Sequence, residues 1–581
     1  MNLKISISIV FIQLMLLSGI KAQGIIIPSG AYVIASNGNI VTKTNWTNNG
    51  SFTANGGTVI FNGTTQTING SAVSSFNNIT IVNGSTTTIS TAGHQLKAVL
   101  LSNGTLNANG NLTVLSTASQ TAAIDGTGTG QVLGNVTMQR YLASGFGYKY
   151  IASPFASDTV GDLSNDMTLS SSFPLLYRHD ENLSSTGWVA YTTGSGVLNP
   201  LQGYAANFGS VTGAKTIDLK GVVNNGSYSR TLYNHNLTYT KGFNLVGNPY
   251  PSPINWNASS GWTKTNIDNA VYYFNAGTTD QYTGVYSSYV NGVSSDGIAG
   301  STIAAMQGFF VHVTNGTFPV TATLGVNNSV RILSPAATFF RVYGETDKTT
   351  VRLRAGFAEE TTASDPLAFY FTNDAKSRNF NKELDALKLM NADVQIPSLF
   401  AIATDTSKLS INALATLRDT SVTIPLGLIT QKQGWISFTA SGMQQLPIGA
   451  AVWFTDKQTG ASYNLQKDSV YRLLLPAGDY ENRFFLQFSP KAETNTGVNT
   501  PVSQEVKMYS NSGRLYVDAG LSTAERATVT VLNTLGQVSY RQEINNQGYQ
   551  PLNIVFASGV YIVQVAGNKQ TISKKIFIPA R

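Results

Sequence analysis

The chain has 581 residues, 12% of them charged, and it contains 54 glycines and no cysteine. A chain of this length predicts several domains, and abundant glycine with few charges favours strands and tight turns over helices. The lack of cysteine excludes disulfides, thiolate nucleophiles, zinc–thiolate sites and a lipid anchor on a leader cysteine.

The formal net charge is +7, but its distribution along the chain matters more than its sum. Residues 500–581 contain eight Lys or Arg and four Asp or Glu. A nucleic-acid-binding protein places a basic face in its working domain. Because the excess here lies at the C-terminal end, we expect no nucleic acid partner.

Residues 1–22 have the features of a signal peptide. Lys4 precedes an apolar run over residues 5–17, and a short polar stretch follows before Gln23. The run is too short to span a membrane as a helix, and no later run reaches about 18 apolar residues. We therefore predict export to the periplasm, no transmembrane helix, and a secreted or surface-attached mature protein.

Residues 23–138 alternate short apolar runs with turns that contain Asn-Gly or Gly-Gly. The clearest runs are residues 58–61, 78–82, 98–101 and 112–115. Such spacing favours a β-solenoid, in which each turn of chain buries its apolar face on its neighbours. A pair of β-sandwiches is the alternative fold.

The same region has few groups that catalyse reactions. Its charged residues are Lys43, Lys97 and Asp125, and it contains one histidine, His94. Hydrolysis or cleavage of a polysaccharide requires at least two acids or bases at one site. One carboxylate does not supply that pair, so we do not expect an active site in the solenoid.

Residues 139–334 contain an internal duplication with two units of about 100 residues each. Residues 147–155 are similar to residues 242–250, and residues 201–205 are similar to residues 306–310. Aromatic runs lie between the members of each pair. This pattern predicts two similar β-domains in tandem.

Two groups of side chains in the duplicated region are candidates for binding. Flat aromatic rings that stack on sugars are the first group: Trp188, Tyr204, Tyr250, Trp256 and Trp262. Clustered oxygen ligands for calcium are the second: Asp158, Asp162, Asn165 and Asp166. We interpret the aromatics as core residues and the acidic loop as a solvated turn. No metal or cofactor is therefore predicted.

Catalytic motifs are also missing from the sequence. It contains no G-x-S-x-G, H-E-x-x-H or G-x-x-x-x-G-K-[ST] pattern. The four histidines, His94, His179, His235 and His312, are widely spaced. His179 precedes two acids, Asp180 and Glu181, a cluster that we interpret as a surface loop. We predict a protein that is not an enzyme and has no catalytic residues.

Residues 335–490 contain about seven short strand patterns separated by turn residues. Their count and spacing predict a β-sandwich or jelly-roll domain. Phe380, Leu384, Leu387 and Met390 fit one face of a short helix. Residues 491–505 have little apolar content and are predicted to be a linker, where a protease finds extended chain.

Residues 506–581 are predicted to form a small all-β domain. The runs at residues 527–532 and 537–540 flank a turn at residues 533–536, which is a hairpin signal. Residues 559–565 and 572–578 are two further strand patterns.

The turn and the last two strand patterns are similar to those of a known family. Five residues in a fixed order mark this similarity: Gly536, Gly559, Tyr561, Lys574 and Lys575. The region resembles the type A C-terminal sorting domain of the type IX secretion system of Bacteroidota. The resemblance implies an Ig-like β-sandwich that the outer-membrane translocon recognises and that a sortase usually removes. Asn533 stands where many members have Asp, which changes one turn residue.

The sequence therefore predicts an all-β chain made of a β-solenoid, a duplicated β-domain, a β-sandwich and an Ig-like tail. We expect a non-enzymatic surface or secreted protein with a structural or adhesive role, whose partners include cell-surface glycans or neighbouring surfaces. The alternative is a glycan-binding or polysaccharide-degradation-associated protein with its site near Trp188, Trp256 or residues 158–166.

Overall fold

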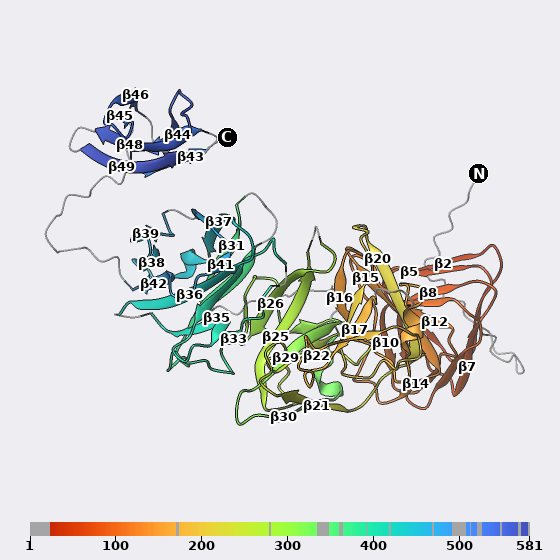
Figure 1. Ribbon diagram of the computed structural model, residues 1–581. Coiled ribbons are helices and arrows are strands. Elements are labelled where there is room, and N and C mark those ends of the chain that lie inside the picture. The colour runs from red at the N-terminus through yellow and green to blue at the C-terminus, as the bar shows by residue number, and fades with distance from the viewer. Residues whose placement is uncertain are drawn as a thin grey trace, which may run out of the picture. The chain divides into compact units, whose positions relative to one another are not determined.

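Figure 1 shows a computed structural model of the chain, which is all-β. The chain divides into two compact units, Met1–Ala492 and Glu493–Arg581. The predicted signal peptide and linker lie outside the described residues. The structure describes residues 24–169, 174–277, 280–333, 348–358, 364–391, 393–417, 420–467, 470–490, 507–511, 513–519, 526–545, 549–566 and 571–578.

The first unit begins with a β-solenoid of about 5 turns, as predicted (Figure 1, red to orange). One face has the strand order β1 (Ile25–Ile27), β4 (Trp46–Asn48), β7 (Thr65–Asn69), β9 (Thr86–Ile89), β11 (Thr105–Asn107) and β14 (Gln131–Leu133). The other has the order β2 (Tyr32–Ala35), β5 (Ser51–Ala54), β8 (Ser74–Ile81), β10 (His94–Ser102), β12 (Leu112–Val114) and β15 (Asn135–Leu142). Next to this second face lie β3 (Asn39–Thr42), β6 (Thr58–Phe61) and β13 (Ala123–Ile124). These strands pair in parallel until β15, which pairs antiparallel with β20 (Lys215–Val222).

Alternating side chains explain why the turns of the solenoid stack. Trp46, Phe52 and Phe76 are buried at its centre, with ring centroids 4.7, 5.4 and 5.5 Å apart. Gly70 has a φ of +122°, and a Cβ at this position would lie 2.0 Å from the carbonyl oxygen of Asn48 on the previous turn. Apolar burial stabilises the stack, and glycine permits the close approach of one turn to the next.

Residues 148–333 form several smaller sheets. One has the order β16 (Tyr148–Ile151), β19 (Tyr204–Asn207), β17 (Leu176–His179) and β18 (Trp188–Tyr191). Another has the order β22 (Phe243–Gly247), β29 (Gly308–Val313), β25 (Ile267–Ala276), β26 (Gly284–Val290) and β27 (Val293–Ser294). A third has the order β21 (Tyr228–Asn234), β30 (Val320–Val326) and β24 (Trp262–Thr265), and β23 (Ile254–Asn255) pairs with β28 (Thr302–Ile303). The 3-10 helices η1 (Val160–Leu163) and η2 (Asn328–Val330) lie in the loops.

Residues 348–490 form one long sheet. Its order is β39 (Ala461–Asn464), β38 (Ala451–Asp456), β42 (Phe484–Ser489), β36 (Val422–Thr430), β34 (Ser398–Ile402), β35 (Lys408–Ala415), β32 (Asp365–Thr372), β31 (Thr350–Phe357), β37 (Gly434–Ser441) and β40 (Val470–Leu475). The short strands β33 (Ala386–Leu387) and β41 (Gly478–Asp479) pair beside it, and η3 spans Met443–Gln445.

The helix predicted from Phe380, Leu384, Leu387 and Met390 is wrong, because this segment is a turn followed by β33. The buried Asp385 carboxylate accepts hydrogen bonds from the backbone N–H of Asn381 at 2.8 Å and of Ala413 at 2.6 Å. These bonds hold the segment as extended chain against β35. Apolar residues three or four apart therefore pack on the sheet here without a helix.

The second unit has two sheets. One has the order β43 (Lys507–Asn511), β44 (Arg514–Asp518) and β47 (Gln550–Pro551). The other has the order β46 (Val538–Ile544), β45 (Ala527–Leu532), β48 (Gly559–Ala566) and β49 (Thr571–Ile578). Leu515, Val517, Val529, Val531 and Val563 are among the buried residues of its core.

Candidate functional site

The five predicted sorting-motif residues lie on neighbouring elements of the second unit. Gly536 is in the turn between β45 and β46, Gly559 and Tyr561 are on β48, and Lys574 and Lys575 are on β49. Gly559 pairs with Ile578, and Lys575 pairs with Ile562, which in turn pairs with Leu532 at the end of β45. The turn, the start of β48 and the end of β49 therefore meet at one end of this sheet.

The turn that contains Gly536 is held by Asn533. The Asn533 side-chain oxygen accepts hydrogen bonds from the backbone N–H of Leu535 at 3.0 Å and of Gln537 at 2.9 Å. Gly536 has a φ of +81°, which favours glycine. A carboxylate oxygen accepts the same two bonds, so Asp at position 533 is compatible with this turn.

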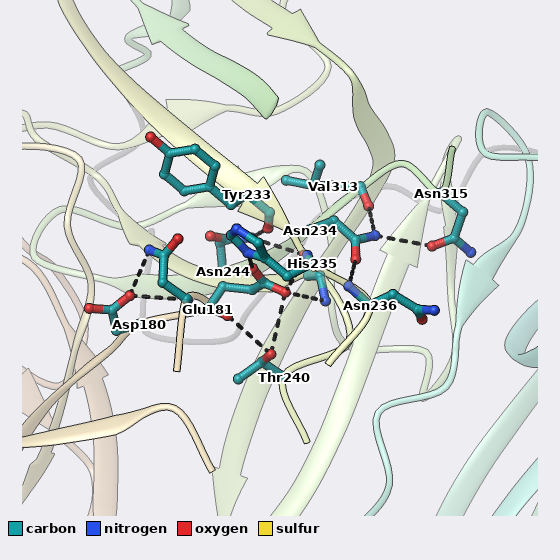
Figure 2. A network of polar contacts seen from close by, with 12 residues as sticks. Asp180, Glu181, Tyr233, Asn234, His235, Asn236, Thr240, Asn244, Val313 and Asn315 are labelled. Carbon is teal, nitrogen blue, oxygen red and sulfur yellow. Dashed lines mark hydrogen bonds and ion pairs between the residues drawn. The ribbon is translucent and has the colours of Figure 1, made fainter. Parts of the chain in front are cut away.

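In the first unit, Glu181 belongs to a buried polar network, whereas the neighbouring Asp180 is partly exposed and pairs with Arg178. Figure 2 shows Glu181 beside the loop that joins β21 to β22. Its carboxylate, 1% exposed, lies 2.6 Å from Nδ1 of His235. It also accepts hydrogen bonds from the backbone N–H of His235 at 2.9 Å and of Gly242 at 3.2 Å. The interpretation of this cluster as a surface loop is therefore wrong for His179 and Glu181, which are buried.

Asparagines complete the network around this loop. Asn234 donates from Nδ2 to the carbonyl oxygen of Val313 at 2.8 Å and to Oδ1 of Asn315 at 3.1 Å (Figure 2). Asn244 donates from Nδ2 to the carbonyl oxygens of Tyr233 and Gly242, both at 2.9 Å. The backbone of the loop is therefore fixed on both sides of His235.

A second carboxylate–histidine pair lies under the same loop. Nδ1 of His312 is 2.5 Å from Oδ2 of Asp268, and its Nε2 is 3.0 Å from the carbonyl oxygen of Lys241. Both side chains are at most 2% exposed. Thr314 donates to the other oxygen of Asp268 at 2.8 Å. The pair therefore holds backbone in place and has no access to a substrate in solution.

Neither pair has the partners of a nucleophilic site. Such a site needs a serine, threonine or cysteine bonded to the imidazole. In the described part of the chain no such hydroxyl is bonded to the ring of His235 or His312, and Thr240 bonds to Glu181 instead. We interpret both pairs as structural clamps.

The other two histidines are buried and neutral. His179 lies on β17, and its ring centroid is 5.0 Å from that of Trp188 and 5.1 Å from that of Phe310. Burial lowers the pKa of His179 to about 4. In the solenoid, His94 accepts from the backbone N–H of Ser74 at 3.0 Å, and burial lowers its pKa as well.

The acidic loop with the calcium candidates is only in part the solvated turn predicted from the sequence, because each of its carboxylates has a protein partner. Asp158 is buried and accepts from Ser153 Oγ at 2.6 Å. Asp162 accepts from the backbone N–H of Thr159 at 2.7 Å, and Asp166 forms an ion pair with Lys215 at 3.2 Å. Asn165 donates to Asp218 at 3.3 Å. The described residues hold no group of three or more His, Cys, Asp or Glu arranged to bind a metal.

The aromatic candidates occupy the interior. Tyr204, Tyr250 and Trp256 are fully buried. The indole of Trp256 donates to the carbonyl oxygen of Asn269 at 2.8 Å, and its ring lies 4.9 Å from that of Trp262. Trp188 is half-buried against His179. A sugar cannot reach Trp256 without unfolding this core, so Trp256 is not a sugar-stacking residue.

Taken with the tail, this fold defines a class: β-rich proteins that are secreted or displayed on the cell surface after type IX sorting. The chain belongs to the family described as domain of unknown function DUF8693, whose model matches residues 34–488. The model of the secretion system C-terminal sorting domain matches residues 505–579. This match confirms the resemblance stated for the tail and assigns the chain to the type IX secretion-sorted proteins of Bacteroidota.

Other comparisons add little. A solved structure titled "Biofilm associated protein - BSP domain" is similar at 10% identity with a TM-score of 0.15, over 75% of this chain. The chain spans 60% of the length of that structure. No curated protein matches the sequence. Among the described residues, none of the helices has the length and hydrophobicity needed to cross a membrane.

Proposed function

We propose that the chain is a non-enzymatic structural or adhesive protein of the outer cell surface. The observation that carries this proposal is the sorting domain at residues 505–579. It is joined to a body in which Glu181, Asp268 and Asp166 each have a protein partner. A structural or adhesive protein needs a stable β fold, and the surface of that fold contacts its partners.

The proposed body includes a true duplication at residues 139–334. Two features support it. The order β16, β19, β17, β18 matches the order β22, β29, β25, β26. Leu201 and Met306, at equivalent positions, both have positive φ, at 57° and 60°.

The contacts between the two copies are reciprocal. Ile151 bridges to Gln307 of the second copy, and Val246 bridges to Gln202 of the first. The rings of Tyr150 and Phe274 stack with centroids 5.0 Å apart, and the hydroxyls of Tyr150 and Tyr286 are 2.8 Å apart. We propose that the copies form one rigid block that connects the solenoid to the long sheet. The predicted β-sandwich domain at residues 335–490 would act as a spacer before the tail.

The proposed route begins with the signal peptide at residues 1–22. The outer-membrane translocon then recognises the tail, and a sortase cuts within residues 491–505. Gly536, Gly559, Tyr561, Lys574 and Lys575 would form the recognised part of the tail, because they lie on neighbouring elements of one sheet.

Deletion of residues 503–581 tests the export proposal. We expect the truncated chain to stay in the periplasm, whereas the full-length chain reaches the surface or the medium. The measurement is cell fractionation with protease shaving of intact cells. Unchanged surface display of the truncated chain would overturn the proposal.

The adhesive role has its own test. A strain that displays the full-length protein is compared with a strain that lacks it, and attachment to a glycan-coated surface and to neighbouring cells is measured. We expect attachment to fall in the strain without the protein. Equal attachment of the two strains would contradict the adhesive role without affecting the export proposal.

A glycan-binding function is the second candidate. The tryptophans that first suggested it are buried or half-buried, but a polar pocket in the solenoid supports it independently.

A further inference from the structure

The wall of the solenoid contains a pocket of about 280 Å³. Among the side chains that line it are Asn55, Asn77, Lys97, Leu115, Thr117 and Gln120. Small-molecule sites usually begin at about 300 Å³, so this volume suits a ligand of one or two small rings. All of the lining residues belong to the solenoid, a region that contains no paired acids.

The lining residues come from equivalent positions on successive turns. Asn55 and Asn77 each lie two residues after the paired positions Thr53 and Ser75. Lys97 follows Leu96, which pairs with Phe76, the residue before Asn77. Leu115 follows Val114, which pairs with Leu96. Because adjacent strands are about 4.8 Å apart, these side chains form a row along the stack.

A bulge in the strands makes room for this row. The pairing of β8 with β10 shifts between Leu96 and Val99. Asn78 fills the bulge: its Nδ2 donates to the carbonyl oxygen of Gly57 at 3.1 Å, and its Oδ1 accepts from the backbone N–H of Val99 at 3.1 Å. The floor of the pocket is therefore fixed before any ligand arrives.

The wall formed by residues 116–121 is fixed as well. Thr117 donates its backbone N–H to the carbonyl oxygen of Gln120 at 2.7 Å, and Ser116 and Thr121 are joined by a β-bridge. The side-chain amide of Gln120 donates to the carbonyl oxygen of Lys97. A preorganised pocket loses less entropy when it binds a ligand.

The polar groups in the row have no protein partners in the described part of the chain. No carboxylate there lies within ion-pair distance of the ammonium of Lys97. The side-chain amides of Asn55 and Asn77 make no hydrogen bond to a described residue. One ammonium and two amides therefore line the same pocket beside the apolar Leu115, whereas the hydroxyl of Thr117 is bonded to Gln120 within its own loop.

We infer that this pocket binds a sugar acid, a polyhydroxylated ring with one carboxylate. The ammonium of Lys97 pairs with the carboxylate, since a charge-assisted bond is the strongest one available there. Asn55 and Asn77 bond to the hydroxyls, and Leu115 packs against the ring. This inference does not depend on the proposed adhesive role, because ligand binding is measured in solution with purified protein.

The test is titration of the purified protein with galacturonate, followed by calorimetry and by NMR of the ligand. We expect saturable binding that weakens as salt rises, and no binding of neutral galactose. Lys97→Met should weaken binding about tenfold or more. The matched control is Lys43→Met, because Lys43 is an exposed lysine of the same solenoid that does not line the pocket.

Three results would overturn the proposal: no saturable binding, equal affinity of the Lys97→Met variant, or equal competition by inorganic sulfate, which would show a simple anion site. Asn77→Ala provides a second variant if Lys97→Met is poorly folded by circular dichroism. It should also weaken binding, with the galacturonate carboxylate still required.

Discussion

The solenoid and the sheets that follow it bury polar groups in different ways. In the first turns of the solenoid, the buried polar centre is neutral: Gln66, fully buried, accepts from the backbone N–H of Gly63 at 2.6 Å and donates to the carbonyl oxygens of Thr42 and Thr44. In the long sheet the corresponding centre is charged. The Asp365 carboxylate and the Lys388 ammonium, both at most 1% exposed, are 2.5 Å apart.

This difference follows from how each region obtains its register. Stacked turns repeat the same shape, so alternating apolar residues and amide bonds define their alignment. The later sheets have no such repeat along one axis, and buried charge pairs lie where their strands and loops meet. Because an unpaired buried charge is costly, such pairs disfavour wrong alignments. We interpret these pairs as determinants of packing in the later sheets.

The largest expected effect comes from breaking the charged centre. Lys388→Met leaves the Asp365 carboxylate buried without a cation, with only neutral donors: the backbone N–H of Leu399 at 2.6 Å and the side chain of Asn391. Loss of one partner of a buried pair costs about 3–5 kcal/mol. We expect the free energy of unfolding of the first unit, measured with guanidinium chloride, to fall by this amount.

The control for this variant is Lys408→Met. Lys408 pairs with Glu481, but both side chains are more than one third exposed. An exposed pair contributes about 0–1 kcal/mol. If the two variants lose equal stability, burial of the Asp365–Lys388 pair does not determine how much the pair contributes to the free energy of unfolding.

A buried carboxyl without a cation should make the later sheets sensitive to pH. Burial raises the pKa of Asp158 to about 7, whereas an unfolded Asp has a pKa of about 3.9. The folded state therefore keeps this proton between about pH 4 and 7 while the unfolded state loses it, so stability falls as pH rises through this window. Asp158→Asn should remove the effect and raise the stability at pH 8 by roughly 2–4 kcal/mol relative to wild type.

The measurement is urea unfolding at pH 4.5, 6 and 8, with Asp280→Asn as the control because Asp280 is exposed. The gain for Asp158→Asn should be small at pH 4.5 and largest at pH 8. A gain that does not change with pH would contradict a raised pKa at Asp158.

The neutral centre of the solenoid should respond differently. Gln66→Leu leaves the N–H of Gly63 and two carbonyl groups without their partner, which costs about 1–3 kcal/mol. Because no charge is involved, we expect the same loss at pH 5 and pH 8. Asn45→Ala is the control, since Asn45 makes an exposed bond to the N–H of Thr67 at 2.9 Å. A loss for Gln66→Leu that varies with pH would contradict this contrast.

The regions also differ in how far sequence predicted them. The solenoid follows from local signals: alternation places Phe52 and Phe76 inside, and Gly70 permits the turn. The tail follows from motifs in order near the terminus. Both depend on residues close in sequence or on a repeated pattern, which a single sequence displays directly.

The buried clusters could not be found in this way. Glu181 and His235 are separated by 54 positions, and Asp268 and His312 by 44. No periodic pattern links such residues, and an acid beside a histidine looks the same in a solvated loop. Trp256 likewise carries no sequence signal that separates a core residue from a sugar-stacking one. For Lys97, the spacing from the Asn-Gly turns indicates that it lies on a turn of the solenoid. The spacing does not indicate that no carboxylate among the described residues pairs with it.

The described residues of the tail include no buried charged side chain, so the tail is a third case beside the solenoid and the long sheet. We expect the smallest loss of stability here. Gly536→Ala places a Cβ at a φ of +81°, where no other atom lies within 4 Å, so only backbone strain opposes it. Such strain costs about 1–2 kcal/mol. Hydrogen exchange of the β45 and β46 amides should speed up accordingly, while Asn533→Asp, which retains the acceptor for Leu535 and Gln537, should leave exchange nearly unchanged. If Asn533→Asp speeds exchange as much as Gly536→Ala, the amide of Asn533 and not the glycine conformation determines the stability of this turn.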